Sequence, residues 1–147
     1  MDILQVLKQE HKEVASMLKK LEKTTGRAKK SREQLFSKLN HSLTLHADFE
    51  EKFFYPQLKR SAKAKDLVLE AYEEHHVVKF LLSELENLSV IDETWQAKLT
   101  VLKENVSHHV KEEEKGLFPK AKTLLGSSKL KALAAQYQEF KEKSNGS

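Results

Sequence analysis

The sequence has no cysteine, and it has few of the residues that build turns. Without cysteine, the chain cannot form disulfides, thiolate-bound metal sites, iron–sulfur clusters or a cysteine nucleophile. Only four glycines and two prolines occur among 147 residues, which disfavours a fold made mainly of loops and tight turns. No apolar run approaches the roughly 18 residues of a membrane span, and the N-terminus does not resemble a signal peptide. We therefore expect a cytoplasmic protein with no membrane partner.

Charged residues are plentiful, but they are not concentrated in one region. Asp, Glu, Lys and Arg make up 33% of the chain, and the formal net charge is +4. The lysines are spread along the sequence, and no nucleic-acid-binding motif accompanies their small clusters, so we expect no nucleic-acid partner. The length and composition favour a single, mainly helical domain that is large enough to bury a core.

An eleven-residue block occurs twice, at residues 46–56 and 109–119. Each copy opens with His, has Glu four and five residues later, continues with Lys, and closes with an aromatic residue and Pro. In a helix, the His and the first Glu lie on one face, one turn apart. A neutral imidazole and a carboxylate that face the same point are suitable ligands for a transition metal. The two pairs are His46 with Glu50 and His109 with Glu113.

The repeat extends upstream of each block. His11 lies 35 residues before His46, and His75 lies 34 residues before His109. Each of these earlier histidines follows a Glu and precedes apolar residues at offsets of three, seven and ten. Such internal similarity indicates two related helical hairpins, each with one His on its first helix and a His-x-x-x-Glu on its second.

Helical periodicity and breaker residues predict five helices in one domain of residues 1–143. The four long helices cover about 2–24, 31–56, 67–88 and 93–117, forming a four-helix bundle over about 2–120, and a short fifth C-terminal helix covers about 128–142. A polar linker is expected at 57–65, and a disordered tail at 144–147. The boundary signals are a capping box of Ser31 with Gln34, N-caps at Asp66 and Asp92, an end or kink at Pro119, and a break at Gly126.

Each long helix carries an apolar stripe with alternating spacings of three and four, which is typical of a four-helix bundle. The four histidines and two glutamates of the repeat fall within these stripes. Burying two carboxylates costs several kcal/mol each unless a charge compensates them, and no Lys or Arg occupies a nearby stripe position. Two metal cations would compensate both, so the pattern predicts a dinuclear centre with one His pair per metal and two bridging carboxylates. The predicted ligands are His11, His46, Glu50, His75, His109 and Glu113.

Neighbouring residues are predicted to have lesser roles. His76 and His108 lie about 100° round their helices from the predicted ligands, which places them at the rim of the site. His41 falls off its stripe and is predicted to be exposed. Tyr72, nearly one turn before His75, could donate a hydrogen bond into the site, although a packing role is more usual for such a residue.

These motifs resemble those of the hemerythrin-like, or HHE cation-binding, family over about residues 3–120. The resemblance implies an all-α, up-down-up-down four-helix bundle that holds a non-heme di-iron centre. It also implies an oxo or hydroxo group between the two irons. The ligand assignment that it implies is His11 and His46 on one iron, His75 and His109 on the other, and Glu50 and Glu113 as bridges.

Three functional hypotheses follow. The first is a di-iron protein that binds or reacts with O2, peroxide or NO, with a peroxide-decomposing or oxidase-like activity left open. Sensing or scavenging is favoured over O2 transport, because Ala71 and Lys79 flank His75 where the oxygen carriers of the family have a second His. The second hypothesis is an iron storage or sensing module without turnover, and the third is a metal-free helical interaction protein. Manganese or zinc would also suit the ligands, whereas a ferritin-like site is disfavoured because Glu-x-x-His occurs only once, at Glu73 and His76.

Overall fold

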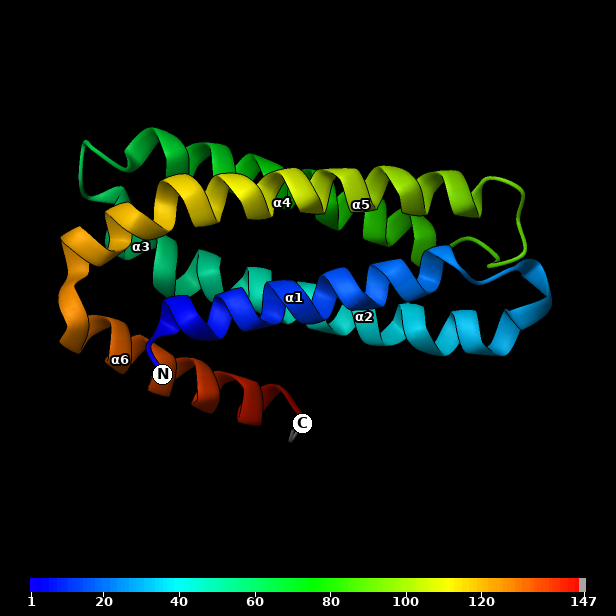
Figure 1. The fold of residues 1–147 in the computed structure, drawn as a ribbon, viewed down its shortest axis with the longest axis horizontal. Helices are drawn as coiled ribbons and strands as arrows, with labels where there is room; N and C mark the ends of the chain where they lie inside the picture. Colours follow the sequence, from blue (N-terminus) through cyan, green and yellow to red (C-terminus); the bar gives the residue numbers. More distant parts are fainter. Residues whose placement is uncertain (146–147) are drawn as a thin grey trace.

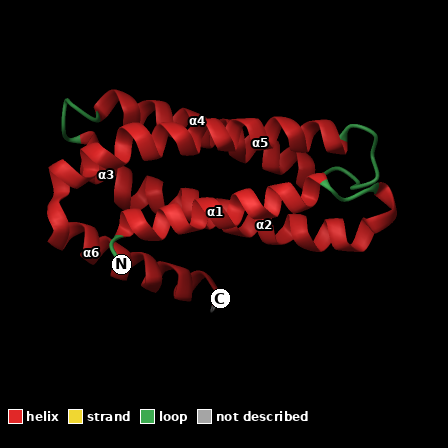
Figure 2. Cartoon of the chain, viewed as in Figure 1, coloured by secondary structure: helices red, strands yellow, loops and turns green. Residues whose placement is uncertain are grey.

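The computed structural model describes residues 1–145 of the chain, and helices dominate them (Figure 1). Figure 2 shows no strand in this described part, which confirms the all-α prediction. The short segment η1 is a 3-10 turn, whereas η2 and η3 are π turns. In chain order the elements are α1 (Ile3–Glu22), η1 (Gly26–Ala28), α2 (Lys29–Phe49), η2 (Glu50–Phe54), α3 (Tyr55–Lys59), α4 (Lys65–Glu86), α5 (Trp95–Glu112), η3 (Glu113–Leu117) and α6 (Phe118–Asn145).

The long helices form the predicted up-down-up-down bundle. α1 packs against α2 and α5, and α4 packs against α5 and α2, so the four helices close into a ring. The turns α1–α2 and α4–α5 lie at one end of the bundle, and the α3–α4 connection lies at the other (Figure 1). The ring therefore brings the middle of all four helices to one level around a common axis.

Two apolar clusters fill the bundle on either side of that level. One cluster contains residues from the start of α1 and from α3, α4 and α6, including Leu7, Leu58 and Leu133. The other gathers the loop end of the bundle, including Leu18, Leu39 and Trp95. Both clusters are buried, and hydrophobic burial is the main force that holds such helices together. The polar residues between them are consequently shielded from water at both ends.

Several predicted helix starts are wrong, because tertiary contacts outweigh the local capping signals. α1 does begin with a capping box, in which Asp2 and Gln5 exchange side-chain-to-backbone hydrogen bonds. α2, in contrast, begins at Lys29 directly after η1, with no side-chain cap, so Ser31 already lies inside the helix. The reason is Arg32, whose buried guanidinium anchors this first turn to the neighbouring loops.

The other two predicted N-caps are also displaced. α4 begins at Lys65, so Asp66 lies in its first turn rather than at the cap. Asp92 accepts hydrogen bonds from the backbone N–H and the hydroxyl of Thr94 in the turn before α5, and Thr94 is the residue at the cap position. Both carboxylates still sit where the helix dipole favours negative charge.

The helices continue through both prolines, whereas the sequence predicted a linker after Pro56 and an end or kink at Pro119. In each copy of the block, the helix widens into a π turn that begins at the predicted bridging Glu. The N–H before each Pro then bonds five residues back, from Tyr55 to Glu50 and from Phe118 to Glu113. A wider turn relieves the clash that a Pro ring makes with the preceding turn of an α-helix.

α6 consists of two helical stretches that meet at Gly126. Its backbone φ angle is 78°, a value that residues other than glycine rarely adopt. This non-helical angle confirms the predicted break. The second stretch folds back alongside α1 and α2 and continues to Asn145 (Figure 1). Ser144 and Asn145 are thus helical where a tail was predicted, and residues 146–147 lie outside the described part. None of the described helices combines the length and apolar character needed to cross a membrane.

Candidate metal centre

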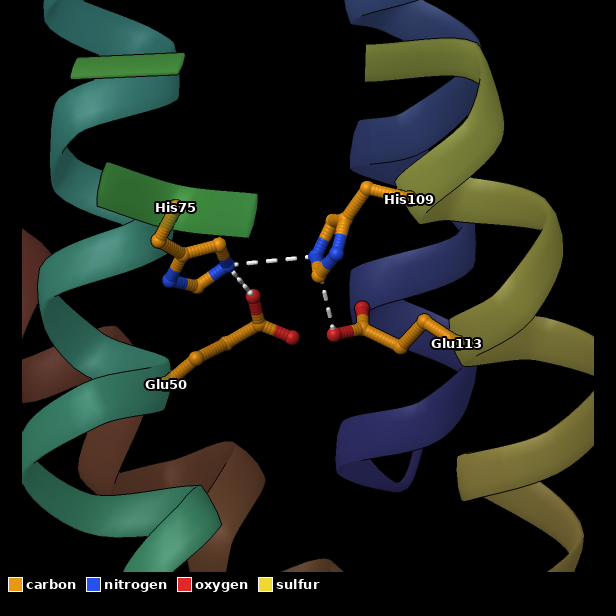
Figure 3. Close-up of side chains that lie close together, drawn as sticks. All are labelled: Glu50, His75, His109 and Glu113. Carbon is orange, nitrogen blue, oxygen red and sulfur yellow. Dashed lines mark hydrogen bonds and ion pairs between the residues drawn. The ribbon is translucent and has the colours of Figure 1, made fainter. Parts of the chain in front are cut away.

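The six residues predicted from the sequence repeat lie together between the two apolar clusters. None of them is more than 7% exposed. The Nε2 atoms of His75 and His109 lie 3.1 Å apart, and Figure 3 shows both rings pointing towards the carboxylates of Glu50 and Glu113. His11 and His46 complete the cluster from the opposite side, with His11 Nε2 3.2 Å from Glu113 Oε1. The atoms form two overlapping groups, which are Glu50, His75, His109 and Glu113, and His11, His46 and Glu113.

Four buried polar atoms of this cluster form no hydrogen bond, and two of them, His11 Nε2 and Glu113 Oε1, contact each other only as an ion pair at 3.2 Å. Among the described residues, only one other buried side-chain nitrogen or oxygen, on Trp95, shares this condition. An unpaired buried polar atom costs about 1–3 kcal/mol, so proteins rarely gather several at one point. Imidazole nitrogens and carboxylate oxygens are ligands for transition metals, and their lack of hydrogen bonds therefore fits a pair of cations. The four atoms are His11 Nε2, His46 Nε2, Glu50 Oε2 and Glu113 Oε1.

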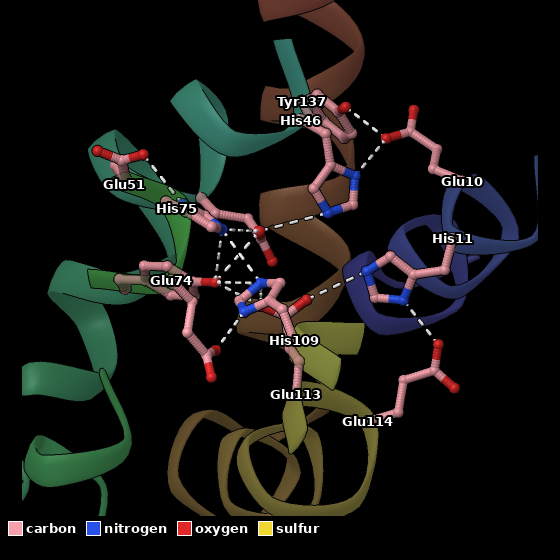
Figure 4. A network of polar contacts seen from close by, with 12 residues as sticks. Glu10, His11, His46, Glu51, Glu74, His75, His109, Glu113, Glu114 and Tyr137 are labelled. Carbon is pink, nitrogen blue, oxygen red and sulfur yellow. Dashed lines mark hydrogen bonds and ion pairs between the residues drawn. The ribbon is translucent and has the colours of Figure 1, made fainter. Parts of the chain in front are cut away.

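The other ring nitrogen of each of the four predicted ligand histidines contacts a carboxylate (Figure 4). A carboxylate only accepts hydrogen bonds, so each Nδ1–H donates one, and the Nε2 of each ring faces the centre, where a neutral ring would offer its lone pair to a metal. The pairs are His11 with Glu114 at 2.6 Å, His46 with Glu10 at 2.8 Å, His75 with Glu51 at 2.9 Å, and His109 with Glu74 at 2.6 Å.

These supporting carboxylates follow the sequence repeat. Glu10 and Glu74 directly precede a first-helix histidine, while Glu51 and Glu114 directly follow the buried glutamates. Glu10 and Glu74 each contact the second-helix histidine of their own hairpin. Glu51 and Glu114 each contact the first-helix histidine of the other hairpin. The repeat was visible in the sequence, but these pairings depend on how the helices face one another.

The buried charges shift the pKa values of the cluster. Burial lowers the pKa of His46, but Glu50 together with the hydrogen bond to Glu10 outweighs this effect and raises it to about 10. Burial likewise lowers the pKa of His109, and Glu113 again raises it well above its usual value. Burial raises the pKa of Glu113, yet the facing His109 holds it well below its usual range. Without a metal, protons on His46 and His109 thus compensate the carboxylates, and metal binding must displace those protons.

Tyr55 is a site residue that the sequence reasoning missed. Its hydroxyl donates to Glu113 and lies 3.2 Å from both Glu50 Oε1 and His75 Nε2. Its side chain is fully buried, and burial beside Glu113 and Glu50 raises the pKa of this phenol well above its usual value. The available signal was a difference between the blocks, because the second copy has Phe118 at the same position.

The remaining predictions for neighbouring residues can be placed. His41 and His76 are exposed, and His108 lies at the rim, 3.1 Å from Glu112 and 3.5 Å from Glu74. Tyr72 does not donate into the centre, because its hydroxyl bonds to the backbone oxygen of Glu51.

A cavity of about 40 Å³ opens beside the four imidazoles. Lys79 lies at this cavity and forms ion pairs with Asp48 at 2.9 Å and with Glu51 at 3.0 Å. Since one water needs roughly 10–15 Å³ of such space, the cavity has room for a molecule of a few atoms. Its other walls are mainly apolar and include Val14, Leu43, Ala47, Val78, Leu82 and Val106.

Comparison with known proteins agrees with this geometry. Residues 2–121 match the family described as Hemerythrin HHE cation binding domain. The chain belongs to this family. It is a hemerythrin-like, metal-binding helical module, and its His and Glu cluster fits a metal site.

Two similar proteins put this membership in context. The crystal structure of a hemerythrin HHE cation-binding domain-containing protein, the Rv2633c homolog from Mycobacterium kansasii, superposes with a TM-score of 0.82. It is 23% identical, covers 97% of this chain and 89% of its own, and shares the fold. A DNA nickase from Nostoc sp. is 27% identical over 143 residues, which cover 97% of this chain. The chain spans only 40% of the length of that nickase.

Proposed function

We propose that this hemerythrin-like protein holds two iron ions and uses them to bind or react with O2, peroxide or NO. The observation that carries the proposal is a set of four ligand atoms without hydrogen bonds, which lie buried at one level between two apolar clusters. Two divalent or trivalent cations would satisfy all four atoms and replace the protons that otherwise compensate the carboxylates.

The proposed ligand set is the one that the repeat indicated. His11 and His46 would hold one iron, His75 and His109 would hold the other, and Glu50 and Glu113 would span both. The Tyr55 hydroxyl adds an oxygen donor beside His75 and His109. The second block has Phe118 at the equivalent position, so the two metal positions differ in the groups beside them.

The surrounding residues suit chemistry on very small molecules. When bound, an iron pair supplies the reversible one-electron steps that reduction of O2 or disproportionation of peroxide requires. The protein contributes the cavity, whose apolar walls admit a small ligand and exclude bulk water. The four supporting carboxylates fix the imidazoles, and six side-chain ligands shared by two metals leave coordination positions open. Open positions distinguish a reactive site from a closed structural one, and they favour sensing or scavenging.

The test begins with metal analysis of protein purified without chelator, and we expect about two iron equivalents per chain. Addition of ferrous iron under anaerobic conditions, followed by air, should then produce near-ultraviolet charge-transfer absorption. The air-oxidised protein should consume added peroxide catalytically. Two bound equivalents without either response would favour storage or sensing, and no bound metal would favour a helical interaction protein.

The bridging assignment has its own experiment. His109→Ala combined with Glu113→Ala should lose close to both equivalents, because a shared carboxylate couples the two metals. The matched control is His108→Ala with Glu112→Ala, which shifts the same i,i+4 pair by one residue to the rim. Full retention of two metals by the first variant would contradict a shared bridge.

A further inference from the structure

The C-terminal half of α6 reaches the metal centre through a buried tyrosine. Tyr137 is 1% exposed, and its ring stacks on Phe49 with centroids 4.3 Å apart. Its hydroxyl donates to Oε1 of Glu10 at 2.5 Å. Lys141, one turn later, places its Nζ 3.3 Å from Oε2 of the same carboxylate. Glu10 is thus held by two donors from a helix that lies outside the four-helix ring.

The same carboxylate oxygen contacts a proposed metal ligand. Oε1 of Glu10 accepts the Tyr137 hydroxyl and lies 2.8 Å from Nδ1 of His46. Figure 4 shows this line of contacts from Tyr137 through Glu10 to His46, whose ring points into the centre. The opposite nitrogen of His46 is one of the four atoms without a hydrogen bond. A donor on α6 therefore acts on the position of that atom.

The other hairpin has no counterpart to this arrangement. Glu74 occupies the equivalent position and supports His109. Its other described partners are the side chains of His108 and Glu112, and Glu112 hydrogen-bonds to it. Both lie at the rim, where the side chains are 64% and 36% exposed. Water competes for hydrogen bonds and ion pairs with such exposed partners, so they restrain a carboxylate less than a buried phenol and an ammonium do. The two supporting glutamates thus differ in how firmly they are fixed, although their local sequences match.

We infer that Tyr137 is a positioning residue for the metal position of His11 and His46, and that α6 thereby makes this position release metal more slowly than it would without the Tyr137 hydroxyl. The inference rests on the proposed dinuclear centre. A fixed Glu10 keeps His46 in the form that carries its proton on Nδ1 and increases the basicity of Nε2. The two α6 donors, Tyr137 and Lys141, lie beyond residue 121, where the family match ends.

The test uses Co²⁺ as a probe, because its visible absorption reports ligand geometry independently of any turnover. The full chain is loaded with two equivalents of Co²⁺, and release to excess chelator is followed by absorption. We expect two kinetic phases, one for each position. Tyr137→Phe should accelerate release from the His11 and His46 position about tenfold, and Glu10→Gln should accelerate the same phase by about 10–100-fold. Glu74→Gln should accelerate the other phase, which reports the His75 and His109 position.

The variant Leu133→Ala distinguishes the loss of the Tyr137 hydroxyl from a general loosening of α6. This variant loosens the packing of the same helix, where Leu133 is 1% exposed, without removing the hydroxyl. It should lower thermal stability and leave both release rates unchanged. Equal acceleration of both phases by Tyr137→Phe and Leu133→Ala would overturn the inference, as would unchanged release from Tyr137→Phe. Failure of the unmodified protein to bind two Co²⁺ ions would instead overturn the proposed centre itself.

Discussion

Tyr55 places a hydroxyl where the second copy of the block has only a phenyl ring. Tyr55→Phe should keep the fold, because the ring still fills the same buried space. It should weaken metal binding at the His75 and His109 position by about 10–100-fold. If the phenol binds ferric iron, the variant should also lose a charge-transfer band in the visible spectrum of the oxidised protein.

Tyr72→Phe is the control for this substitution, since that hydroxyl bonds to the backbone oxygen of Glu51 and not to the centre. It should leave the metal stoichiometry and the spectrum unchanged. Identical spectra and metal affinities for Tyr55→Phe and the unmodified protein would contradict a role for the phenol.

The protonation of His46 predicts a pH dependence for the metal-free protein. Its pKa is 6.5 in the unfolded chain and about 10 in the folded one. The stabilisation from the charged ring is therefore complete below pH 6.5 and is lost as the pH rises towards 10. The free energy of unfolding of the metal-free protein, measured with urea, should fall between pH 6.5 and about 9, below the usual titration of Tyr and Lys.

The metal-loaded protein is the comparison for this prediction. Metal binding requires the neutral ring, so this group should contribute no such fall once the centre is filled. Metal uptake at pH 7 should release protons, which a pH indicator in weak buffer detects. Equal pH profiles with and without metal would show that His46 is not charged in the metal-free protein.

At the scale of the elements, one arginine ties the loop end of the bundle together. The Arg32 guanidinium donates to the backbone oxygens of Val90 and Thr24 and stacks over the Trp95 ring at 4.4 Å. Arg32→Ala should lower the free energy of unfolding by about 2–3 kcal/mol, because it leaves these buried acceptors without a donor. Denaturant unfolding measures the change, and metal stoichiometry should stay at two. Arg27→Ala, at an exposed position of the adjacent turn, should change stability little.

The elements also show what the sequence could predict. The stripes of apolar residues located all four long helices, since that spacing directly determines which face is buried. Helix starts were less predictable, because Ser31 offered a local cap while Arg32 made long-range contacts that decided the boundary. The π turns were missed because Pro56 and Pro119 are ordinary helix breakers, and nothing in the local sequence shows that a wider turn accommodates them.

At the scale of the site, the duplicated spacing predicted which six residues would meet. It did not predict the partners of their Nδ1 atoms, because Glu51 and Glu114 act across the bundle and their reach depends on helix rotation. Tyr55 was missed for a similar reason, since the π turn that begins at Glu50 carries it inward. The spacing also does not select the metal, because imidazole and carboxylate ligands suit several transition metals.

For the whole molecule, metal removal should lower stability. A metal that binds only the folded state stabilises it by about 2.7 kcal/mol per site at a free concentration one hundred times its Kd. For a chain of this size, that corresponds to roughly 5–10 °C in Tm per site. Differential scanning calorimetry with and without Fe²⁺ under anaerobic conditions measures the shift. Ca²⁺ is the control, because it prefers oxygen ligands and should stabilise little, and an equal shift with both ions would contradict a nitrogen-rich site.

The exchange of carboxylates between the hairpins has a consequence for symmetry. Glu51 supports His75 and Glu114 supports His11, so the contact is reciprocal. Two identical hairpins related by a two-fold axis would satisfy the same reciprocity, as in a symmetric homodimer. Such a homodimer, however, would carry either two phenols or none at its centre. Joining the halves in one chain removes that restriction, so a single phenol, that of Tyr55, can face the candidate metal centre while Phe118 occupies the equivalent position in the other half.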